Sequence, residues 1–126
     1  MAKLMFHLVS PASEFFSGEV DQVNIPGADG DFGVLANHTP LMTSVDSGVL
    51  VVINGSDEQR IYVSGGFAEI TADGLTVLAE FALPEAELKG EALAHAKERA
   101  ETSLKLADTP AAIIAAQRAV DALAAY

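Results

Sequence analysis

The sequence predicts an all-β domain, a sandwich or a barrel, followed by an antiparallel pair of helices. Residues 1–83 hold 9 of the 10 glycines and consist of short apolar segments separated by turn residues. Residues 84–126 hold 14 alanines in 43 residues. Short strands with frequent turn signals are typical of sandwiches and barrels, whereas alanine has the strongest helix preference. We therefore expect two domains, 1–83 and 84–126.

The first two predicted strands both end at a proline. Lys3 to Ser10 is followed by Pro11, and Glu19 to Ile25 is followed by Pro26-Gly27. Proline has no backbone N–H to give to a ladder of hydrogen bonds, so it ends a strand or confines it to an edge.

The next predicted strands form two hairpins. Residues 49–53 are a continuous apolar run, which is expected for a buried strand. Asn54-Gly55 then supplies a tight turn, and residues 59–63 return. Asp73-Gly74 makes a second turn between residues 67–71 and 75–80. Gly65-Gly66 allows a close ligand approach or a bend between strands, and we prefer the bend.

Residues 84–126 are predicted to form two helices that pack closely. Pro84 suits a first helical turn, and Glu85 and Glu87 suit the positive end of a helix. Asp108-Thr109-Pro110 predicts a break, an N-cap and a new helix. Small side chains recur along both segments and let two helices approach. The predicted contact stripes are Leu88, Ala92, Ala96, Ala100 and Leu104, and then Ile113, Ala116, Val120 and Leu123.

Composition restricts the class of partner. The net charge is −11, from 18 acidic and 7 basic residues. Nucleic acids and anionic lipid surfaces are both bound mainly through Lys and Arg, so neither is expected, and a basic protein partner fits better. The chain has no cysteine, which excludes disulfides and zinc-thiolate sites. No secretory signal and no run of about 18 apolar residues is present, so we expect no membrane insertion.

The segment GDFGVLANHTPL, residues 30–41, raises the question of a reactive loop. Asp31-Phe32-Gly33 matches the kinase metal triplet, but the other kinase motifs are missing. No calcium loop or phosphate-binding loop is complete either. His38 is the one plausible catalytic residue, yet it has no evident nucleophile, and the three histidines lack metal spacing. We therefore expect an exposed apolar recognition loop and no cofactor.

A larger set of segments occurs in a fixed order and resembles the epsilon subunit of bacterial F-type ATP synthases. The match extends from about residue 4 to residue 81. It consists of Leu8-Val9-Ser10-Pro11; Ile25-Pro26-Gly27 with Gly30, Phe32-Gly33-Val34-Leu35, His38 and Pro40-Leu41; Gly48 with Leu50; and Val63-Ser64-Gly65-Gly66-Phe67-Ala68-Glu69-Ile70.

The resemblance implies a β-sandwich of about ten strands followed by a two-helix hairpin. It also implies a non-catalytic subunit of the central stalk that helps couple proton flow to ATP synthesis. The implied partners are the gamma subunit and the c-ring, and transiently the alpha and beta subunits of the catalytic head. Such a protein would lie at the cytoplasmic face of the bacterial inner membrane as a peripheral component.

The resemblance also assigns interface residues. The turn that contains Asp31 would face the polar loops of the c-ring. The region His38–Met42, with Thr39, Leu41 and Met42, would lie near that contact and near gamma.

The hairpin departs from relatives that bind ATP. Lys89 and Ala92 stand where those relatives carry an Asp and an Arg. Only Arg99 and Arg118 remain as candidate nucleotide contacts, so we expect ATP binding to be weak or absent. With five bases against seven acids in residues 84–126, we also expect a weak or vestigial inhibition of ATP hydrolysis.

Two other functions are compatible with the residues alone. A stand-alone β-sandwich that binds a ligand would need exposed aromatics, and the chain has no Trp and two Tyr. A small hydrolase or isomerase would use His38 with an acid, and His38→Ala would then abolish turnover.

Overall fold

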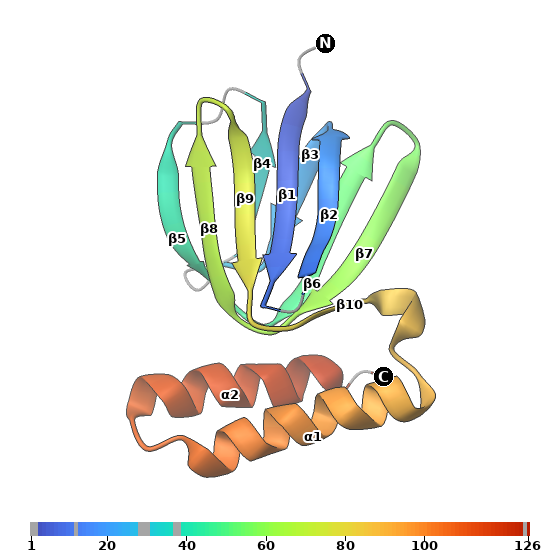
Figure 1. Cartoon of the computed structure of the whole chain (residues 1–126). Helices are drawn as coiled ribbons and strands as arrows, with labels where there is room; N and C mark the ends of the chain where they lie inside the picture. Colours follow the sequence, from blue (N-terminus) through green and yellow to red (C-terminus); the bar gives the residue numbers. More distant parts are fainter. Residues whose placement is uncertain (1–2, 12, 28–30, 37–38, 125) are drawn as a thin grey trace.

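The computed structural model describes residues 3–11, 13–27, 31–36, 39–124 and 126. Within them the chain forms ten β-strands, one short 3-10 helix and two α-helices (Figure 1). The strands are β1 (Leu4–Ser10), β2 (Ser13–Val20), β3 (Gln22–Ile25), β4 (Phe32–Leu35), β5 (Leu41–Val45), β6 (Gly48–Asn54), β7 (Asp57–Val63), β8 (Gly66–Thr71), β9 (Gly74–Ala79) and β10 (Ala82–Pro84). The helices are η1 (Glu85–Glu87), α1 (Gly90–Leu106) and α2 (Pro110–Leu123).

The strands form two five-stranded sheets that face each other. Sheet A has the order β2-β1-β9-β8-β5, and sheet B has the order β10-β7-β6-β3-β4. Within the described strands, β1 and β9 run parallel, and the other pairs are antiparallel. Figure 1 shows sheet A in front and the helices below one end of the sandwich. The predicted β-sandwich with two packed helices is confirmed.

Alternation along the strands fills the space between the sheets. Every second side chain points inward, and full burial of one Val, Leu, Ile or Phe contributes about 1.5–3 kcal/mol. The rings of Phe6 and Phe16 pack with their centroids 5.4 Å apart. The largest fully buried members of this core include Phe6, Leu8, Val23, Ile25, Val34, Leu50, Val63, Leu75 and Val77.

The predicted turns are confirmed. Gly55, between β6 and β7, has φ +65°, and Gly74, the first residue of β9, has φ +148°. Gly65, with φ +64°, forms the bend that leads from β7 into β8, as preferred from the sequence. Positive φ at these positions favours glycine, which lacks a Cβ.

The predicted strand Glu19–Ile25 is wrong in its extent. The chain bends at Asp21, which separates β2 from β3. The Asp21 carboxylate pairs with Lys3 at 2.6 Å and accepts the Gly55 N–H at 2.6 Å, and this lowers the pKa of Asp21. Strand β2 was not predicted because SEFFSGEV lacks a regular alternation. It pairs with β1 along its length, with a bulge between Leu8 and Val9.

The apolar segment predicted as a loop contains two strands. Phe32–Leu35 forms β4 at one edge of sheet B, and Leu41–Val45 forms β5 at one edge of sheet A. Val34 is fully buried, whereas Leu35 is half exposed. The segment therefore divides between core and surface, and the predicted loop is corrected to a segment that contains two edge strands.

The first helix begins later than predicted. Pro84 ends β10, and α1 begins at Gly90, whose φ of +59° places it at a helix start and not in a helix interior. Thr109 caps α2 as predicted, because its side-chain oxygen accepts the Ala112 N–H at 3.1 Å. Ile113 was predicted in the contact stripe but is about half exposed.

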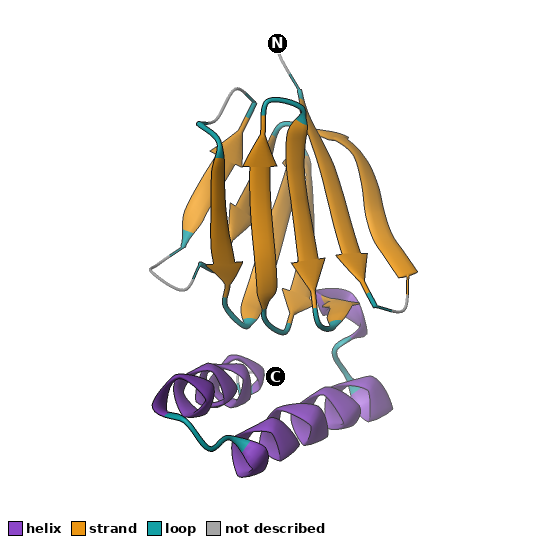
Figure 2. Ribbon diagram, turned by 60° about the vertical axis from the view of Figure 1, so that its left-hand side comes forward, coloured by secondary structure: helices purple, strands orange, loops and turns teal. Residues whose placement is uncertain are grey.

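The hairpin lies across one end of the sandwich (Figures 1 and 2). Its contact with the sandwich forms a second apolar cluster, separate from the main core. Tyr62 of β7 is 1% exposed beneath it, and the ring of Phe81 meets Tyr62 edge to face. The remaining buried members are Leu88, Ala96, Ala100, Ala119 and Leu123.

Candidate docking surface

The outer face of sheet A carries a row of apolar side chains. The strand register places Val9 of β1 beside Leu78 of β9, Leu78 beside Phe67 of β8, and Phe67 beside Ser44 of β5. Phe67 is 57% exposed and Leu78 is 53% exposed, although large apolar side chains are usually buried. This row is therefore a candidate contact surface.

Met42 extends the row toward the sheet edge. It pairs with Glu69 on β8, which places it diagonal to Phe67 and within reach of a long side chain. Met42 is 65% exposed. We call Val9, Met42, Phe67 and Leu78 the sheet A patch. An open groove of about 360 Å³ lies against it, lined by Val9, Ser10, Pro11, Gly66, Phe67, Leu78, Ala79 and Glu80.

The sheet A patch is uncovered by the rest of the described chain and has an acidic rim. Both views show the helices at the end of the sandwich and not over this face. Glu14 lies opposite Val9 on the neighbouring strand, Glu69 lies opposite Met42, and Glu80 lines the groove. A contiguous apolar face marks a contact with another molecule, and an acidic rim favours a partner with basic residues around an apolar centre.

The alternation of β8 and β9 carries a sequence signal for Phe67 and Leu78. In β8, Ala68 and Ile70 point into the core, so Phe67 shares its face with Glu69 and Thr71. In β9, Leu78 shares its face with Thr76 for the same reason. On a strand with one buried face, the outward-facing positions are usually polar. A large apolar residue at one of these positions therefore indicates a functional surface.

The predicted interface residues do not form one surface. Asp31 is exposed and precedes Phe32, which pairs with Ile25 at the hairpin end of the sandwich. Leu41 is the first residue of β5 and pairs with Ile70, at the end of the sandwich that lies away from the hairpin. Thr39 precedes this strand by two residues. Met42 alone belongs to the sheet A patch. His38 lies outside the described residues.

The two candidate nucleotide-contacting arginines are both engaged with the sandwich. The Arg99 guanidinium lies 4.8 Å from the centroid of the Phe81 ring. Arg118 of α2 pairs with Asp46 of the sandwich at 2.5 Å. Lys89 and Ala92, at the start of α1, contribute none of the charged groups that the ATP-binding motif would need.

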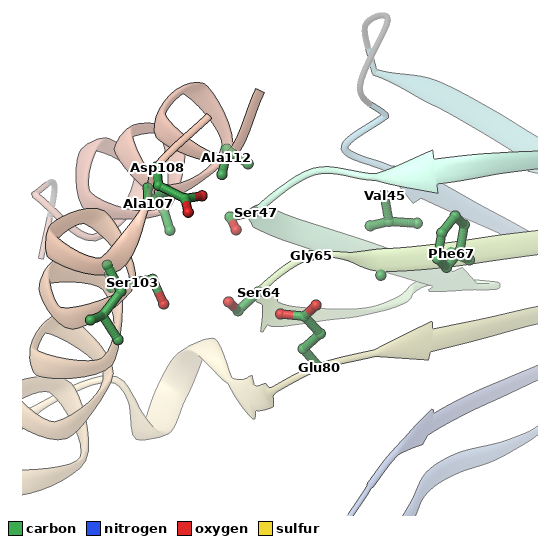
Figure 3. Close-up of a pocket in the computed structure, with 16 residues that line it drawn as sticks. Val45, Ser47, Ser64, Gly65, Phe67, Glu80, Ser103, Ala107, Asp108 and Ala112 are labelled. Atoms are coloured by element: carbon green, nitrogen blue, oxygen red, sulfur yellow. The ribbon is translucent and has the colours of Figure 1, made fainter. Parts of the chain in front are cut away.

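A groove of about 540 Å³ lies between the sandwich and the hairpin, but its chemistry does not suit a phosphate. Figure 3 shows Ser47, Ser64 and Glu80 on the sandwich side and Ser103 and Asp108 on the hairpin side. None of the described residues that line it is basic. Two acids without a base would repel a nucleotide triphosphate.

The connection to the hairpin carries a cluster of polar groups around Glu85. Arg60 Nε donates to the Glu85 carboxylate at 3.0 Å, and the Tyr126 hydroxyl donates to the same carboxylate at 2.5 Å. These contacts, the Tyr126 hydrogen bond foremost, lower the pKa of Glu85. Partial burial and the bond to Glu85 raise the pKa of Tyr126 to about 12.

The described residues show no arrangement for catalysis. His7 Nδ1 lies 3.0 Å from Ser17 Oγ and 3.3 Å from Glu14 Oε1, so the hydroxyl and the acid compete for one ring nitrogen. A Ser-His-acid relay requires the two partners on opposite nitrogens. No group of three metal-ligating side chains occurs in the described part of the chain.

None of the described helices has both the length and the apolar character that a bilayer crossing requires.

Comparison with known proteins agrees with these features. The family model for "ATP synthase, Delta/Epsilon chain, beta-sandwich domain" matches residues 3–85. The chain is 45% identical to the ATP synthase epsilon chain of Maricaulis maris over 98% of both chains. It is 54% identical to the epsilon chain of Caulobacter vibrioides over 68% of this chain and 100% of the relative.

Solved structures show the same architecture. A chain in the Euglena gracilis mitochondrial ATP synthase (OSCP/F1/c-ring) superposes with a TM-score of 0.74 at 26% identity, covering 99% of this chain and 81% of that one. A chain in the Tetrahymena thermophila mitochondrial ATP synthase (central stalk/c-ring) superposes with a TM-score of 0.71 at 13% identity, covering 98% and 96%, which supports the fold alone. The chain therefore belongs to the family of ATP synthase epsilon chains, which are non-catalytic subunits of that complex.

Proposed function

We propose that the chain is a central-stalk subunit of an F-type ATP synthase and that it docks on the gamma subunit through the sheet A patch. Its role is to help couple proton translocation through the c-ring to ATP synthesis in the catalytic head. The observation that carries the proposal is the uncovered apolar row Val9–Leu78–Phe67 in a member of the epsilon-chain family. Docking would remove this row from water.

Apolar burial supplies most of the binding energy in this proposal. Burying an exposed Phe or Leu side chain fully contributes about 1.5–3 kcal/mol, so Phe67 and Leu78 are the expected anchors. The acidic rim, with Glu14, Glu69 and Glu80, steers a basic partner and sets its orientation more than it adds affinity.

Contact with the c-ring is assigned to the loop at Asp31. The residue is exposed, and a carboxylate suits a basic or amide-rich loop. A solvent-exposed ion pair contributes only about 0–1 kcal/mol, so Asp31 would orient the contact more than hold it. The chain would then lie at the cytoplasmic face of the bacterial inner membrane as a peripheral component, held by gamma and the c-ring.

The hairpin has at most a weak regulatory role in this proposal. Its transient partners would be the alpha and beta subunits, and its acidic balance weakens attraction to an acidic segment there. ATP binding is also expected to be weak or absent, because the inter-domain groove holds Glu80 and Asp108. Calorimetric titration with ATP should give no binding in the micromolar range.

Co-purification tests the docking proposal. The tagged chain should retain the gamma subunit and the c-ring, and Phe67→Glu should abolish this retention. Leu106→Glu is the matched control, because Leu106 is 77% exposed on the hairpin and outside the patch. Retention of gamma by the Phe67→Glu chain, or equal loss in the control, would refute docking through this face.

A further inference from the structure

A histidine of β1, His7, lies on the same outer face as the sheet A patch. Phe6 and Leu8 are fully buried, so the alternation of the strand turns His7 and Val9 outward. Strand β1 lies between β2 and β9 (Figure 1), and its parallel pairing with β9 places Leu78 beside Val9. The His7 side chain therefore borders the patch, and it is 40% exposed, so a docked partner can reach it.

The contacts of the His7 ring determine which of its nitrogens carries the proton. Nδ1 lies 3.0 Å from Ser17 Oγ and 3.3 Å from Glu14 Oε1. A carboxylate only accepts hydrogen bonds, whereas a hydroxyl can accept or donate. A bare Nδ1 would point its lone pair at the Glu14 carboxylate, but a protonated Nδ1 attracts both oxygens. We therefore place the proton of the neutral ring on Nδ1, where Glu14 and Ser17 act as positioning residues.

This assignment leaves Nε2 of His7 as a bare acceptor at the border of the patch. Among the described residues, the hydrogen bonds of this ring run through Nδ1. A nitrogen with a free lone pair accepts from an N–H group and repels another acceptor. Because the patch has an acidic rim, with Glu14 and Glu69, the donor that suits this position is a basic side chain.

We propose that Nε2 of His7 accepts a hydrogen bond from a Lys or Arg side chain of the gamma subunit, and that tight docking requires the neutral ring. The inference rests on the proposed docking through the sheet A patch, to which it adds a polar contact. Protonation turns Nε2 into a donor and gives the ring a positive charge, so the ring then repels the same basic group. Docking should therefore weaken as the pH falls.

The charged groups that face His7 set the sign of this effect. On β2, Glu14 contacts the ring, and Glu19, which lies opposite Met5, is diagonal to it. On the other side, Thr76 of β9 is uncharged, and β1 itself carries no other charged residue. The two acids attract a protonated ring in the free chain, whereas a basic group of gamma disfavours it in the complex. Docking therefore releases the proton, and the affinity rises with pH.

The test is the affinity of the full-length chain for the gamma subunit, measured by calorimetry between about pH 5.5 and pH 8, the range in which an imidazole changes charge. An NMR titration of the free chain gives the midpoint for His7, and each pH unit below it should weaken binding by about ten-fold. His7→Gln stays uncharged and should remove this dependence. His7→Lys carries a permanent charge and should bind at least about ten-fold more weakly even at pH 8.

The two other histidines provide matched controls. His95 is exposed on α1, outside the patch, and its ring packs beside that of Phe81 with the centroids 6.4 Å apart. His38 lies outside the described residues, in the region that the resemblance assigned to an interface. His95→Gln and His38→Gln should both keep the pH dependence of the unaltered chain. A dependence that disappears with either of them and persists in His7→Gln would overturn the proposal.

A second readout needs no gamma subunit. Long-range proton–nitrogen NMR spectra of the free chain at pH 8 should show a protonated Nδ1 and a bare Nε2 for His7, and the opposite tautomer would overturn the proposal. The calorimetry also separates the two levels of the argument. Absence of binding at pH 8 by the unaltered chain would refute docking on gamma itself, whereas tight binding with the same pH dependence in His7→Gln would refute only the role of His7.

Discussion

At the start of β8, Gly66 lies too close to the neighbouring strand for any side chain. A Cβ built on it would lie 1.9 Å from the Leu78 carbonyl oxygen, and its φ is +144°. The Gly65-Gly66 pair was predicted as a bend from the sequence, but the close approach to Leu78 could not be, because it depends on the pairing of β8 with β9. The same pairing brings Phe67 and Leu78 together on the docking face.

We therefore predict that Gly66→Ala lowers the free energy of unfolding by at least about 2 kcal/mol, through backbone strain and the clash. Gly55→Ala is the matched control, because Gly55 has φ +65° but nothing within 4 Å of an added Cβ. It should cost about 1 kcal/mol. Urea denaturation measures both values. Equal losses in the two variants would show that the Leu78 contact is unimportant.

The Tyr126 hydroxyl gives a second prediction for a single residue. Partial burial and the bond to Glu85 raise its pKa to about 12, from an ordinary tyrosine value of 10.0. Since the folded-state pKa is raised, this bond stabilises the closed hairpin fully below about pH 10 and is lost as the pH rises through about 12.

Tyrosinate absorbance should therefore show a step near pH 12 that Tyr126→Phe removes. In Glu85→Gln the step should move toward pH 10, since the carboxylate charge is gone. Circular dichroism at each pH would confirm that the sandwich remains folded. Titration of Tyr126 near its ordinary pKa in the unaltered chain would contradict the contact with Glu85.

Among the elements, strands and turns with strong local signals were predictable from the sequence, and elements fixed by long-range pairing were not. Asn54-Gly55, Asp73-Gly74 and the Thr109 N-cap were correctly predicted because each depends on local chemistry. Strand β2 exists because β1 offers it a partner, and β4 and β5 are edge strands within an apolar segment. Pro84 was predicted to start a helix, but it belongs to β10, which pairs with β7. Helix α1 therefore begins later, at Gly90.

The candidate docking surface was predicted only in part. Met42 was assigned to an interface from the resemblance, and it lies on the sheet A patch. Phe67 and Leu78 were not assigned, because single strands do not show which apolar residues share an outer face. Asp31 and Leu41 were both assigned to an interface from the resemblance, but the β4–β5 segment carries them to opposite ends of the sandwich.

The hairpin as an element should be dispensable for assembly. Deleting residues 84–126 is expected to preserve ATP synthesis and to change ATP hydrolysis less than about two-fold, because these residues carry five bases against seven acids.

The truncation also uncovers Tyr62, which is 1% exposed in the full chain, so the melting temperature of the truncated protein should be measured alongside. A several-fold activation of hydrolysis by a truncated chain that remains folded would show that the hairpin inhibits strongly.

For the whole molecule, one end of the sandwich and the outer face of sheet A carry different features. One end carries the hairpin, whose Arg118 pairs with Asp46 and whose following residue Tyr126 donates a hydrogen bond to Glu85. The outer face of sheet A carries the apolar sheet A patch with acidic residues around it, and no described element covers this patch. The core between the two sheets lies beneath both features. Among the described residues it contains no buried polar side chain. This arrangement suits a rigid adaptor that transmits force between partners and makes or breaks no bonds itself.

The most direct test of this account is the affinity of the purified chain for the gamma subunit, measured by calorimetry for the unaltered protein, Phe67→Glu, Leu78→Glu and the control Leu106→Glu. Docking through the sheet A patch predicts tight binding by the unaltered chain and the control, and a loss of at least about 2 kcal/mol in binding free energy for each patch variant. Binding of gamma with unchanged affinity by both patch variants, each shown to be folded, would contradict docking through sheet A.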